Sequence, residues 1–308
     1  MKNYKLMLMK KILILGSSNT DMVVKSERLP KPGETIIGGD FMINPGGKGA
    51  NQAVAASRLG GDVIFVCKVG NDDFGERTCA ILEKEKIDTS YIIKEKGGIS
   101  GVALITVDKD GENSIVVASG TNASFSVSDL SDVKDVIKNA SILVLQLEIP
   151  IGTAIEASKI AKENGVTVML NPAPAPSNGI PKELLDNVDI IIPNETEAEI
   201  ITGIEVFNSE TAVKAAEVMN GMGISTVIIT MGSKGAFLKD NKHSILIPST
   251  KVNAIDTTAA GDTFCGALSV AFAESQDIVD AIKFACKASA IAVTRMGAQA
   301  SIPYRKEL

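Results

Sequence analysis

The chain has 308 residues, 45% of them hydrophobic, and a formal net charge of −6. This acidic balance argues against a general binder of nucleic acids or anionic membranes, because neither attracts an acidic surface. Four cysteines without C-x-x-C spacing and a single histidine, His243, provide little for a zinc site, a disulfide framework or a Ser–His–Asp triad. We therefore expect reduced thiols in a cytoplasmic protein.

Residues 1–16 are basic and then apolar, a pattern that signal peptides also show. Lys10 and Lys11 interrupt the apolar run and no small-residue cleavage pattern follows, so we expect no signal peptide. Residues 11–15 instead predict a first buried strand. No uninterrupted apolar run approaches the ~18 residues that a membrane span requires.

Further β-rich apolar runs alternate with helix-like segments along the chain. The runs are mostly continuous, which is typical of strands that are buried on both faces. Helices are predicted at 50–59, 152–163 and 210–220, and a glycine that can end the helix follows each of them closely. The alternation predicts an α/β fold with a three-layer, doubly wound, mainly parallel sheet of the Rossmann-like kind. The predicted strands are residues 11–15, 63–69, 141–147, 166–170, 188–192 and 225–230.

Two segments interrupt this alternation. Residues 22–45 are rich in Pro and Gly and contain strand-like pieces, and residues 99–118 have the pattern of a hairpin around Asp110-Gly111. Neither segment has the composition of a flexible linker. Together they predict a small antiparallel sheet beside the main one, in the position of a lid.

Polar residues follow each predicted buried strand. Because the carboxyl ends of parallel strands meet at one edge of a sheet, these residues predict a ligand site at that edge. Asn19, Asp21, Asn51 and Glu148 suit a polyhydroxylated ligand, because carboxylates and amides exchange hydrogen bonds with hydroxyl groups. The strands farther along the chain are followed by Asn171, by Asn194, Glu195 and Glu197, by MGSKG at 231–235 and by DTTAAGD at 256–262.

Glycine-rich stretches in the chain suit phosphate groups. The stretch GGKGAN at 46–51 departs from the G-x-x-x-x-G-K-[ST] pattern of P-loop enzymes, because Gly49 follows Lys48 and Met42 stands at the leading position. It also departs from G-x-G-x-x-G, since Gln52 stands where the third glycine belongs. The chain is therefore expected to be neither a P-loop enzyme nor an ordinary Rossmann oxidoreductase.

The stretch AIDTTAAGDTFCGAL at 254–268 places one acid, Asp262, directly after small residues and before an apolar, helix-like run. Small residues let a ligand approach the backbone closely, and a helix N-terminus favours anions. Asp262 is then either the cap of a helix or a general base beside a bound anion. These residues alone leave both interpretations open.

Eight longer motifs occur in order along the chain: GSSNTD at 16–21, LPKPGETIIG at 29–38, NPGGKGANQAVAASRLG at 44–60, QLEIP at 146–150, NPAPA at 171–175, NETEAE at 194–199, TMGSKGA at 230–236 and DTTAAGDTF at 256–264. Together they resemble the PfkB-type sugar kinase family, and within it the members that phosphorylate ribose. The resemblance runs from about residue 10 to the C-terminus. It implies a single domain over residues 1–308, with lid segments at 22–45 and 99–118, and ATP-dependent phosphorylation of D-ribose at O5. A sibling kinase for deoxyribose, another sugar or a nucleoside is the alternative, and a non-catalytic sugar-binding protein is a more distant one.

The resemblance also implies roles for single residues. Asp262 is the general base that takes the proton from the sugar hydroxyl as this attacks the γ-phosphate of ATP. Ala259, Ala260 and Gly261 form an anion hole for the transferred group. Lys48 remains ambiguous, since its ammonium contacts either phosphate or solvent. The residues that hold D-ribose are Asn19, Asp21, Gly47, Lys48, Asn51, Glu148 and Asp262.

For the nucleotide, the resemblance places Asn194 and Glu197 near Mg²⁺ and the phosphates of ATP. Two residues depart from the family pattern. Ala259 stands where many relatives carry Gly, which costs little if its φ is negative, and Cys286 stands where an Asn often lies beside the nucleotide. The residues that border the nucleotide are Asn194, Glu197, Thr230, Gly232, Gly235, Gly261 and Cys286.

The resemblance further implies activation by a monovalent cation, K⁺, and a homodimer formed through the lid. The loop before Asp262 supports a cation site, because its carbonyl groups must point elsewhere when its N–H groups turn toward phosphate. Asp256 is the only acid between residues 241 and 261, so it is the expected carboxylate ligand, although it would otherwise simply cap a turn. The implied ligand set is Asp256, Thr258, Ala292, Arg295, Gly297 and Ser301.

Overall fold

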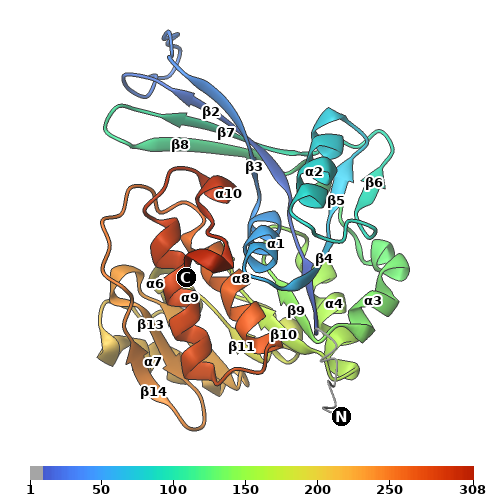
Figure 1. Cartoon of the computed structure of the whole chain (residues 1–308), viewed down its shortest axis with the longest axis vertical. Helices are drawn as coiled ribbons and strands as arrows, with labels where there is room; N and C mark the ends of the chain where they lie inside the picture. Colours follow the sequence, from blue (N-terminus) through green and yellow to red (C-terminus); the bar gives the residue numbers. More distant parts are fainter. Residues whose placement is uncertain (1–9) are drawn as a thin grey trace, which may run out of the picture.

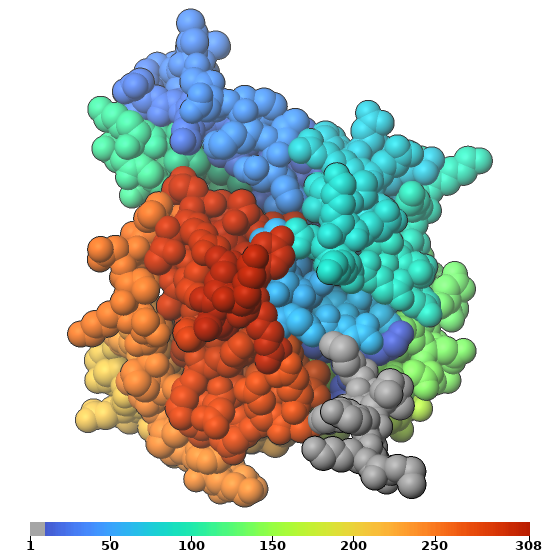
Figure 2. All heavy atoms as spheres, viewed as in Figure 1, coloured from blue at the N-terminus to red at the C-terminus, as the bar shows by residue number. Residues whose placement is uncertain are grey.

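The computed structural model describes residues 10–308 and shows an eight-stranded sheet between two layers of helices, with a four-stranded sheet at one end (Figure 1). In the space-filling view of Figure 2, this end projects from the top of the molecule. Residues 1–9, which carry much of the segment compared above with a signal peptide, lie outside the described residues. From residue 10 onward, no helix has both the length and the apolar character that crossing a bilayer demands.

The large sheet is mainly parallel, as the sequence predicts. Its strand order is β14-β13-β12-β11-β10-β9-β1-β4, and its antiparallel pairs are β12–β13 and β13–β14. The pleat sends Ile12 and Ile14 of β1 to one core and Leu13 and Leu15 to the other, so both faces are buried. The strands are β1 (Lys11–Leu15), β4 (Asp62–Val66), β9 (Ile142–Leu145), β10 (Thr167–Leu170), β11 (Ile190–Ile191), β12 (Thr226–Thr230), β13 (Ala236–Lys239) and β14 (Ser244–Ile247).

Helices cover both faces of this sheet. One face packs against α1 (Lys48–Arg58), α8 (Ala260–Ala273) and α9 (Ile278–Ala292). The other face packs against α3 (Lys134–Asn139), α4 (Ile151–Glu163), α5 (Lys182–Leu185), α6 (Glu195–Thr202) and α7 (Ser209–Gly221). The three helices predicted from the sequence correspond to α1, α4 and α7 within two residues at each end.

Helices α1 and α8 approach each other unusually closely. A Cβ atom at Gly266 would lie 2.6 Å from Cβ of Ala55 and 2.7 Å from the carbonyl oxygen of Gln52. Because no side chain fits there, a glycine is required for the two backbones to pack at this distance. The contact brings the start of α8 alongside the start of α1.

The lid is a four-stranded sheet in the order β3-β2-β7-β8, at the top of Figure 1. Its pairs β2–β3 and β7–β8 are antiparallel, as predicted, and β7 and β8 form the hairpin expected around Asp110-Gly111. The central pair, β2–β7, is parallel because both strands leave the body of the protein in the same direction, starting from the paired residues Asn19 and Gly101. The strands are β2 (Asn19–Lys25), β3 (Phe41–Gly46), β7 (Gly101–Val107) and β8 (Asn113–Ala118).

The predicted strand at 63–69 proves to be two strands. The first is β4 of the large sheet, and after Cys67 the chain continues as β5 (Lys68–Gly70), which pairs in parallel with β6 (Ile93–Glu95). The continuous apolar run did not reveal this change of sheet, because both parts are buried. The remaining elements are α2 (Asp73–Lys84), η1 (Gly120–Asn122), η2 (Val127–Asp132), η3 (Gly232–Lys234), α10 (Ala298–Ser301) and η4 (Arg305–Glu307).

Candidate active site

Polar residues that follow the strands of the large sheet line three adjoining cavities. The first, of about 180 Å³, contains Lys48 and Asp262. The second, of about 330 Å³, and the third, of about 790 Å³, share Ser289 with each other, and Ala260 lines all three, so the cavities lie next to one another. The predicted residues that line the first two are Lys48, Asn194, Glu197, Thr230, Gly232, Gly235, Ala259, Ala260, Gly261, Asp262 and Cys286.

Asp262 lies in the first turn of α8 and is held by two amides of α1. Asn51 Nδ2 donates to its Oδ2 at 2.9 Å, and Gln52 Nε2 donates to its Oδ1 at 3.0 Å. Burial raises the pKa of this carboxyl, while Lys48 and the two amides act in the opposite direction. The residue at the N-cap of α8 is Ala259, so Asp262 is not the helix cap. A buried carboxylate that faces a cavity has the properties of a general base.

Asn51 has one polar atom that the described residues leave unpaired. Its Oδ1 is buried and has no hydrogen-bond partner among residues 10–308. Buried amide oxygens are normally paired. This unpaired oxygen belongs to the same side chain that donates a hydrogen bond to the Asp262 carboxylate. A hydroxyl group of a bound ligand would satisfy it.

The start of α8 is strained. Ala259 has a φ of 58°, in the left-handed region, where an alanine costs about 1–2 kcal/mol relative to its normal conformation. The condition under which this substitution would cost little, a negative φ, is therefore not met. The N–H of Ala260 donates to the carbonyl of Thr257 at 3.2 Å. Gly261 and Asp262 follow in the first turn of α8, where backbone N–H groups have no carbonyl partner within the helix, and both residues line the first cavity.

Two residues that the sequence analysis expects to bind the sugar, Asp21 and Glu148, are carboxylates close enough for the charge of one to affect the other. Glu148 Oε2 accepts hydrogen bonds from the hydroxyl of Ser17 and from the backbone N–H of Lys48, the latter at 3.0 Å. Burial, and then the charge of Glu148, raise the pKa of Asp21 to about 6. A Cβ atom at Gly46 would lie 2.2 Å from Asp21 Oδ2, so the glycine makes room for this carboxylate.

Asn19 is oriented by a residue that the sequence analysis did not identify, Asn122. Asn122 Nδ2 donates to Asn19 Oδ1 at 2.8 Å, and the same side chain bonds both the N–H and the carbonyl of Ser18 at 3.0 Å. The Oδ1 of Asn19 is thereby engaged, which leaves its Nδ2 as the group to donate to a ligand. Gly47, with a φ of 89°, packs against Ser18 and Asn19 where a Cβ atom would approach within 3.0 Å.

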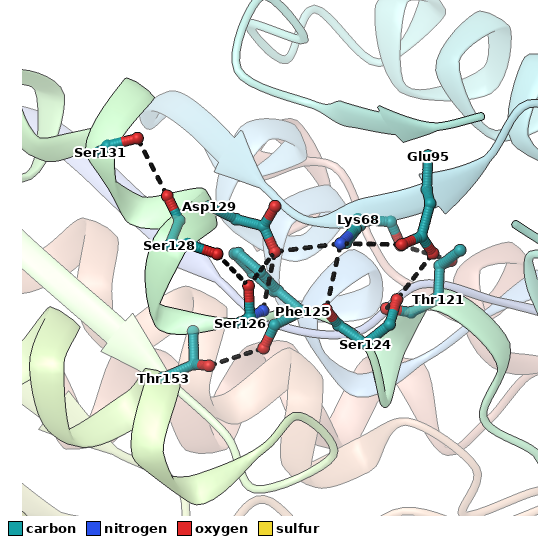
Figure 3. Close-up of polar contacts among 10 residues, drawn as sticks. All are labelled: Lys68, Glu95, Thr121, Ser124, Phe125, Ser126, Ser128, Asp129, Ser131 and Thr153. Atoms are coloured by element: carbon teal, nitrogen blue, oxygen red, sulfur yellow. Dashed lines mark hydrogen bonds and ion pairs between the residues drawn. The ribbon is translucent and has the colours of Figure 1, made fainter.

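A buried lysine, Lys68, holds the loop that carries Asn122 through hydrogen bonds and ion pairs (Figure 3). Lys68 Nζ lies 3.0 Å from Asp129 Oδ2, 3.0 Å from the carbonyl of Ser124 and 3.2 Å from Glu95 Oε1. Burial by itself disfavours the ammonium, but the two carboxylates raise the pKa of Lys68 above its usual value. This ion cluster joins β5, β6 and η2.

Asn194 and Glu197, which the sequence analysis expects beside the nucleotide, form a reciprocal cap at the start of α6. Asn194 Oδ1 accepts from the N–H of Glu197 at 2.7 Å, and Glu197 Oε2 accepts from the N–H of Asn194 at 2.9 Å. Burial raises the pKa of Glu197, partly offset by the hydrogen bond from Asn194 and by Lys48. Carboxylate oxygen is a ligand that Mg²⁺ accepts, so this residue fits the predicted position near the metal.

Asp256 bridges the two loops from which the cation ligands were predicted. Its Oδ1 accepts from the N–H of Thr258 at 2.9 Å, and its Oδ2 accepts from the N–H of Gly297 at 2.8 Å. Burial raises the pKa of Asp256, but these hydrogen bonds outweigh it and leave the pKa below its usual value. Among the predicted ligands, Ala292 O accepts from Arg295 N at 3.0 Å, and Ser301 Oγ donates to Ala298 O at 2.8 Å. Residues 10–308 contain no cluster of three His, Cys, Asp or Glu side chains that would hold a metal.

Several residues of the site were missed by the sequence analysis. Residues 249–254 and Ser289 line the third cavity, and Gln52 contacts the carboxylate of Asp262. Gln52 stood within a quoted motif, but its neighbours gave no reason to single it out. The loop at 249–254 has neither strand nor helix periodicity, so no pattern marked it.

The fold and the site together define a phosphotransferase, with the buried carboxylate of Asp262 lining a cavity at the start of α8. The chain belongs to the pfkB family of carbohydrate kinases, which matches residues 9–305. It is 47% identical over 298 residues to the ribokinase of Haemophilus influenzae and 46% identical over 300 residues to that of Staphylococcus aureus. These alignments cover 97% of this chain and 97% and 98% of the two relatives.

A solved structure agrees with these relatives. The structure of Arabidopsis thaliana ribokinase complexed with ribose and ATP superposes with a TM-score of 0.91 and 34% sequence identity, covering 96% of both chains. The expected family and fold class are therefore confirmed.

The raised pKa of Asp21 predicts a stability that depends on pH. The folded pKa of about 6 exceeds the usual aspartate value of 3.8, so ionisation of Asp21 opposes folding, and stability decreases as the pH rises through this interval. Asp21→Asn should stabilise the free protein at pH 8 by up to about 3 kcal/mol, and by much less at pH 4. Denaturant unfolding at both pH values measures the difference.

The matched control for this variant is Asp135→Asn, because the side chain of Asp135 is 93% exposed. The control should change stability by a similar small amount at both pH values. If Asp21→Asn shifted stability equally at pH 4 and pH 8, the ionisation of Asp21 would not be the cause.

Proposed function

We propose that the protein transfers the γ-phosphoryl group of ATP to O5 of D-ribose. The observation that carries the proposal is the buried carboxylate of Asp262, which faces a cavity at the start of α8 while amides of α1 hold both of its oxygens. The kinship with ribokinases over nearly the whole chain supports the same reaction.

In this proposal, Asp262 accepts the proton of the sugar hydroxyl as that oxygen attacks the γ-phosphorus atom, whose bond to the bridging oxygen breaks so that ADP leaves. The free N–H groups at the start of α8 donate to the transferred phosphoryl group and stabilise its charge. Although burial disfavours its ammonium, the carboxylates of Asp262, Glu148 and Glu197 raise the pKa of Lys48, so this residue remains a cation. Its charge lines the same cavity and would offset that of the phosphates.

The sugar is held by the residues at the ends of β1, β2 and β9. Asp21 and Glu148 would accept hydrogen bonds from ribose hydroxyls, and Asn19 would donate through its Nδ2. Asn51 Oδ1, which is buried and unpaired among residues 10–308, would accept another. These contacts favour a small ligand with several hydroxyl groups.

The nucleotide occupies the second and third cavities. Phosphates would lie near Thr230, Gly232 and Gly235, and the base in the larger cavity lined by residues 249–254. Mg²⁺, held mainly by phosphate and water oxygens, would neutralise part of the negative charge, with Glu197 as the carboxylate nearest to it. Cys286 lines the second cavity, and burial raises the pKa of its thiol to about 11, so it would contact the nucleotide as a neutral group.

We also propose that a monovalent cation, K⁺, activates the enzyme. Asp256 already joins the loops at 256–258 and 297, and a cation bound by its carboxylate and by nearby carbonyl groups would fix the loop that precedes the anion hole. The four cysteines are unbonded thiols, which supports a reducing compartment, the cytoplasm.

The lid supports a homodimer. Strand β8 lies at the edge of the lid sheet with all six residues exposed, among them Ile115, Val116 and Val117, which are between 52% and 65% exposed. An exposed apolar edge strand needs to be covered in solution. A second copy of the lid would cover it.

The substrate assignment is tested by measuring ADP release with ribose, deoxyribose, fructose, adenosine and uridine at saturating Mg-ATP. Ribose should give the highest kcat/KM, and phosphorus NMR should locate the product phosphate at C5. Asp262→Asn should lower kcat by ~10²–10⁴-fold, whereas the exposed Asp135→Asn should leave it unchanged. A higher kcat/KM for any of the other four acceptors would overturn the assignment.

The cation proposal is tested by comparing turnover in KCl, NaCl and tetramethylammonium chloride at equal ionic strength. Turnover should be highest in KCl, and Asp256→Ala should remove the difference between the salts. Equal rates in all three salts would refute the proposal, as would an Asp256→Ala variant that keeps the full response to K⁺.

The dimer is tested by light scattering at micromolar concentration. The unmodified protein should have the mass of a dimer, and Val116→Asp in β8 should give a monomer. Ile245→Asp is the matched control, because Ile245 is 41% exposed on β14, the edge strand of the other sheet. A monomeric unmodified protein with full activity would contradict the proposal.

A further inference from the structure

Two buried glutamines lie behind the carboxylate of Asp262. Gln52 Nε2 donates to Asp262 Oδ1 at 3.0 Å and to Asn171 Oδ1 at 3.1 Å, and its Oε1 accepts from Gln146 Nε2 at 2.7 Å. Both glutamines are 0% exposed. The result is a chain of amides that begins at the end of β9 and ends on the proposed base.

The polarity of this chain is determined by its two ends. Asn171 Nδ2 donates to the carbonyl of Ile192 at 2.9 Å, so its Oδ1 must face Gln52. An ionised Asp262 offers only acceptors. Gln52 must therefore turn its NH₂ group toward Oδ1 of Asp262 and Oδ1 of Asn171. Its own oxygen then faces Gln146, which must present an NH₂ group in turn.

This arrangement is unfavourable for the fold by itself. Gln146 Oε1 is buried and has no hydrogen-bond partner among residues 10–308, and such groups oppose folding. The position of Gln146 also requires a glycine directly after β1, because a Cβ atom at Gly16 would lie 1.9 Å from Gln146 Oε1. An apolar pair at positions 52 and 146 would avoid both constraints, so fold stability alone does not account for these amides.

We propose that Gln52, held in place by Gln146, is a positioning residue that fixes the orientation of the Asp262 carboxylate and favours its ionised form. Asn51 bonds one carboxylate oxygen and Gln52 the other, from consecutive positions of α1, so rotation of the carboxylate would break both hydrogen bonds. The proposal rests on the proposed function only in that Asp262 acts as the base.

The electrostatic surroundings of Asp262 determine the sign of the expected effect. Lys48 of α1 favours its ionised form, while Glu148, after β9, and Glu197 of α6 disfavour it. Cys265, one turn along α8, is a buried thiol whose pKa is raised well above its usual value, first by burial, so it remains neutral. Burial raises the pKa of Asp262, and the Gln52 hydrogen bond lowers it. Loss of that hydrogen bond should therefore raise the pKa further.

The experiment measures kcat and both KM values between pH 5 and pH 9 for Gln52→Leu, Gln52→Glu and Gln146→Leu. In Gln52→Leu, the apparent pKa of the acidic limb of the kcat–pH profile should rise by about one pH unit. The KM for ATP should be unchanged. Gln52→Glu keeps the shape but exchanges the donor for a second carboxylate, so its shift should be larger. Gln146→Leu should give a smaller shift of the same sign.

The matched control is Ser158→Ala, which removes a buried polar group from α4, on the opposite face of the sheet. It should leave the limb in place. The proposal would be overturned if Gln52→Leu and Gln146→Leu both lowered kcat at every pH without changing the apparent pKa of the acidic limb. Gln52 would then have only a structural role. If Gln52→Leu fails to fold, Gln146→Leu decides by the same criterion.

A second measurement separates this proposal from the proposed function. Carbon NMR of protein labelled at the aspartate carboxyl carbons, with Asp262 assigned from the Asp262→Asn spectrum, follows the ionisation of Asp262 without turnover. Gln52→Leu should raise its midpoint by about one pH unit, and an unchanged midpoint would overturn the proposal. If the unmodified protein did not phosphorylate ribose, the proposed function would fail, and this titration would still decide the role of Gln52.

Discussion

The close contact between helices α1 and α8 is the constraint on which the site depends. Gly266 lets the two backbones approach, and this approach places Asn51 and Gln52 within hydrogen-bond distance of Asp262. A wider separation would leave a buried carboxylate without donors, which is among the least favourable states in a protein interior. The same contact sets the start of α8 against the cavity that contains Lys48.

Several unfavourable features of the structure involve the residues of the site and their hydrogen-bond partners. Asp21 and Glu148 are two carboxylates close together, Ala259 has a left-handed backbone, and Asn51 and Gln146 each bury an oxygen without a partner among residues 10–308. The two apolar cores, one on each face of the large sheet, offset the free energy that these features cost. Such a distribution is typical of binding sites, where a ligand supplies the missing interactions.

Much of the architecture was predictable from local pattern. Strands such as β1, β9, β10 and β12 are short, continuous apolar runs, and helices α1, α4 and α7 end near glycines, so their existence and order were predicted correctly. The prediction was wrong at residues 63–69, where one run supplies strands to two sheets, because burial on both sides hides the change. It also missed the parallel pairing of β2 with β7, since register between distant strands leaves no local signal.

The sequence by itself determined the family, the order of the elements and the edge of the sheet at which polar residues gather, because these follow from motifs and from periodicity. Only the tertiary structure decided which donors hold the base. Gln52 and Asp262 are 210 residues apart in the chain and 3.0 Å apart in space. The left-handed backbone of Ala259 and the raised pKa of Asp21 likewise arise from groups that only folding brings together. Hydrogen bonds and desolvation act over a few ångströms, and the spacing of residues along a chain does not encode such distances.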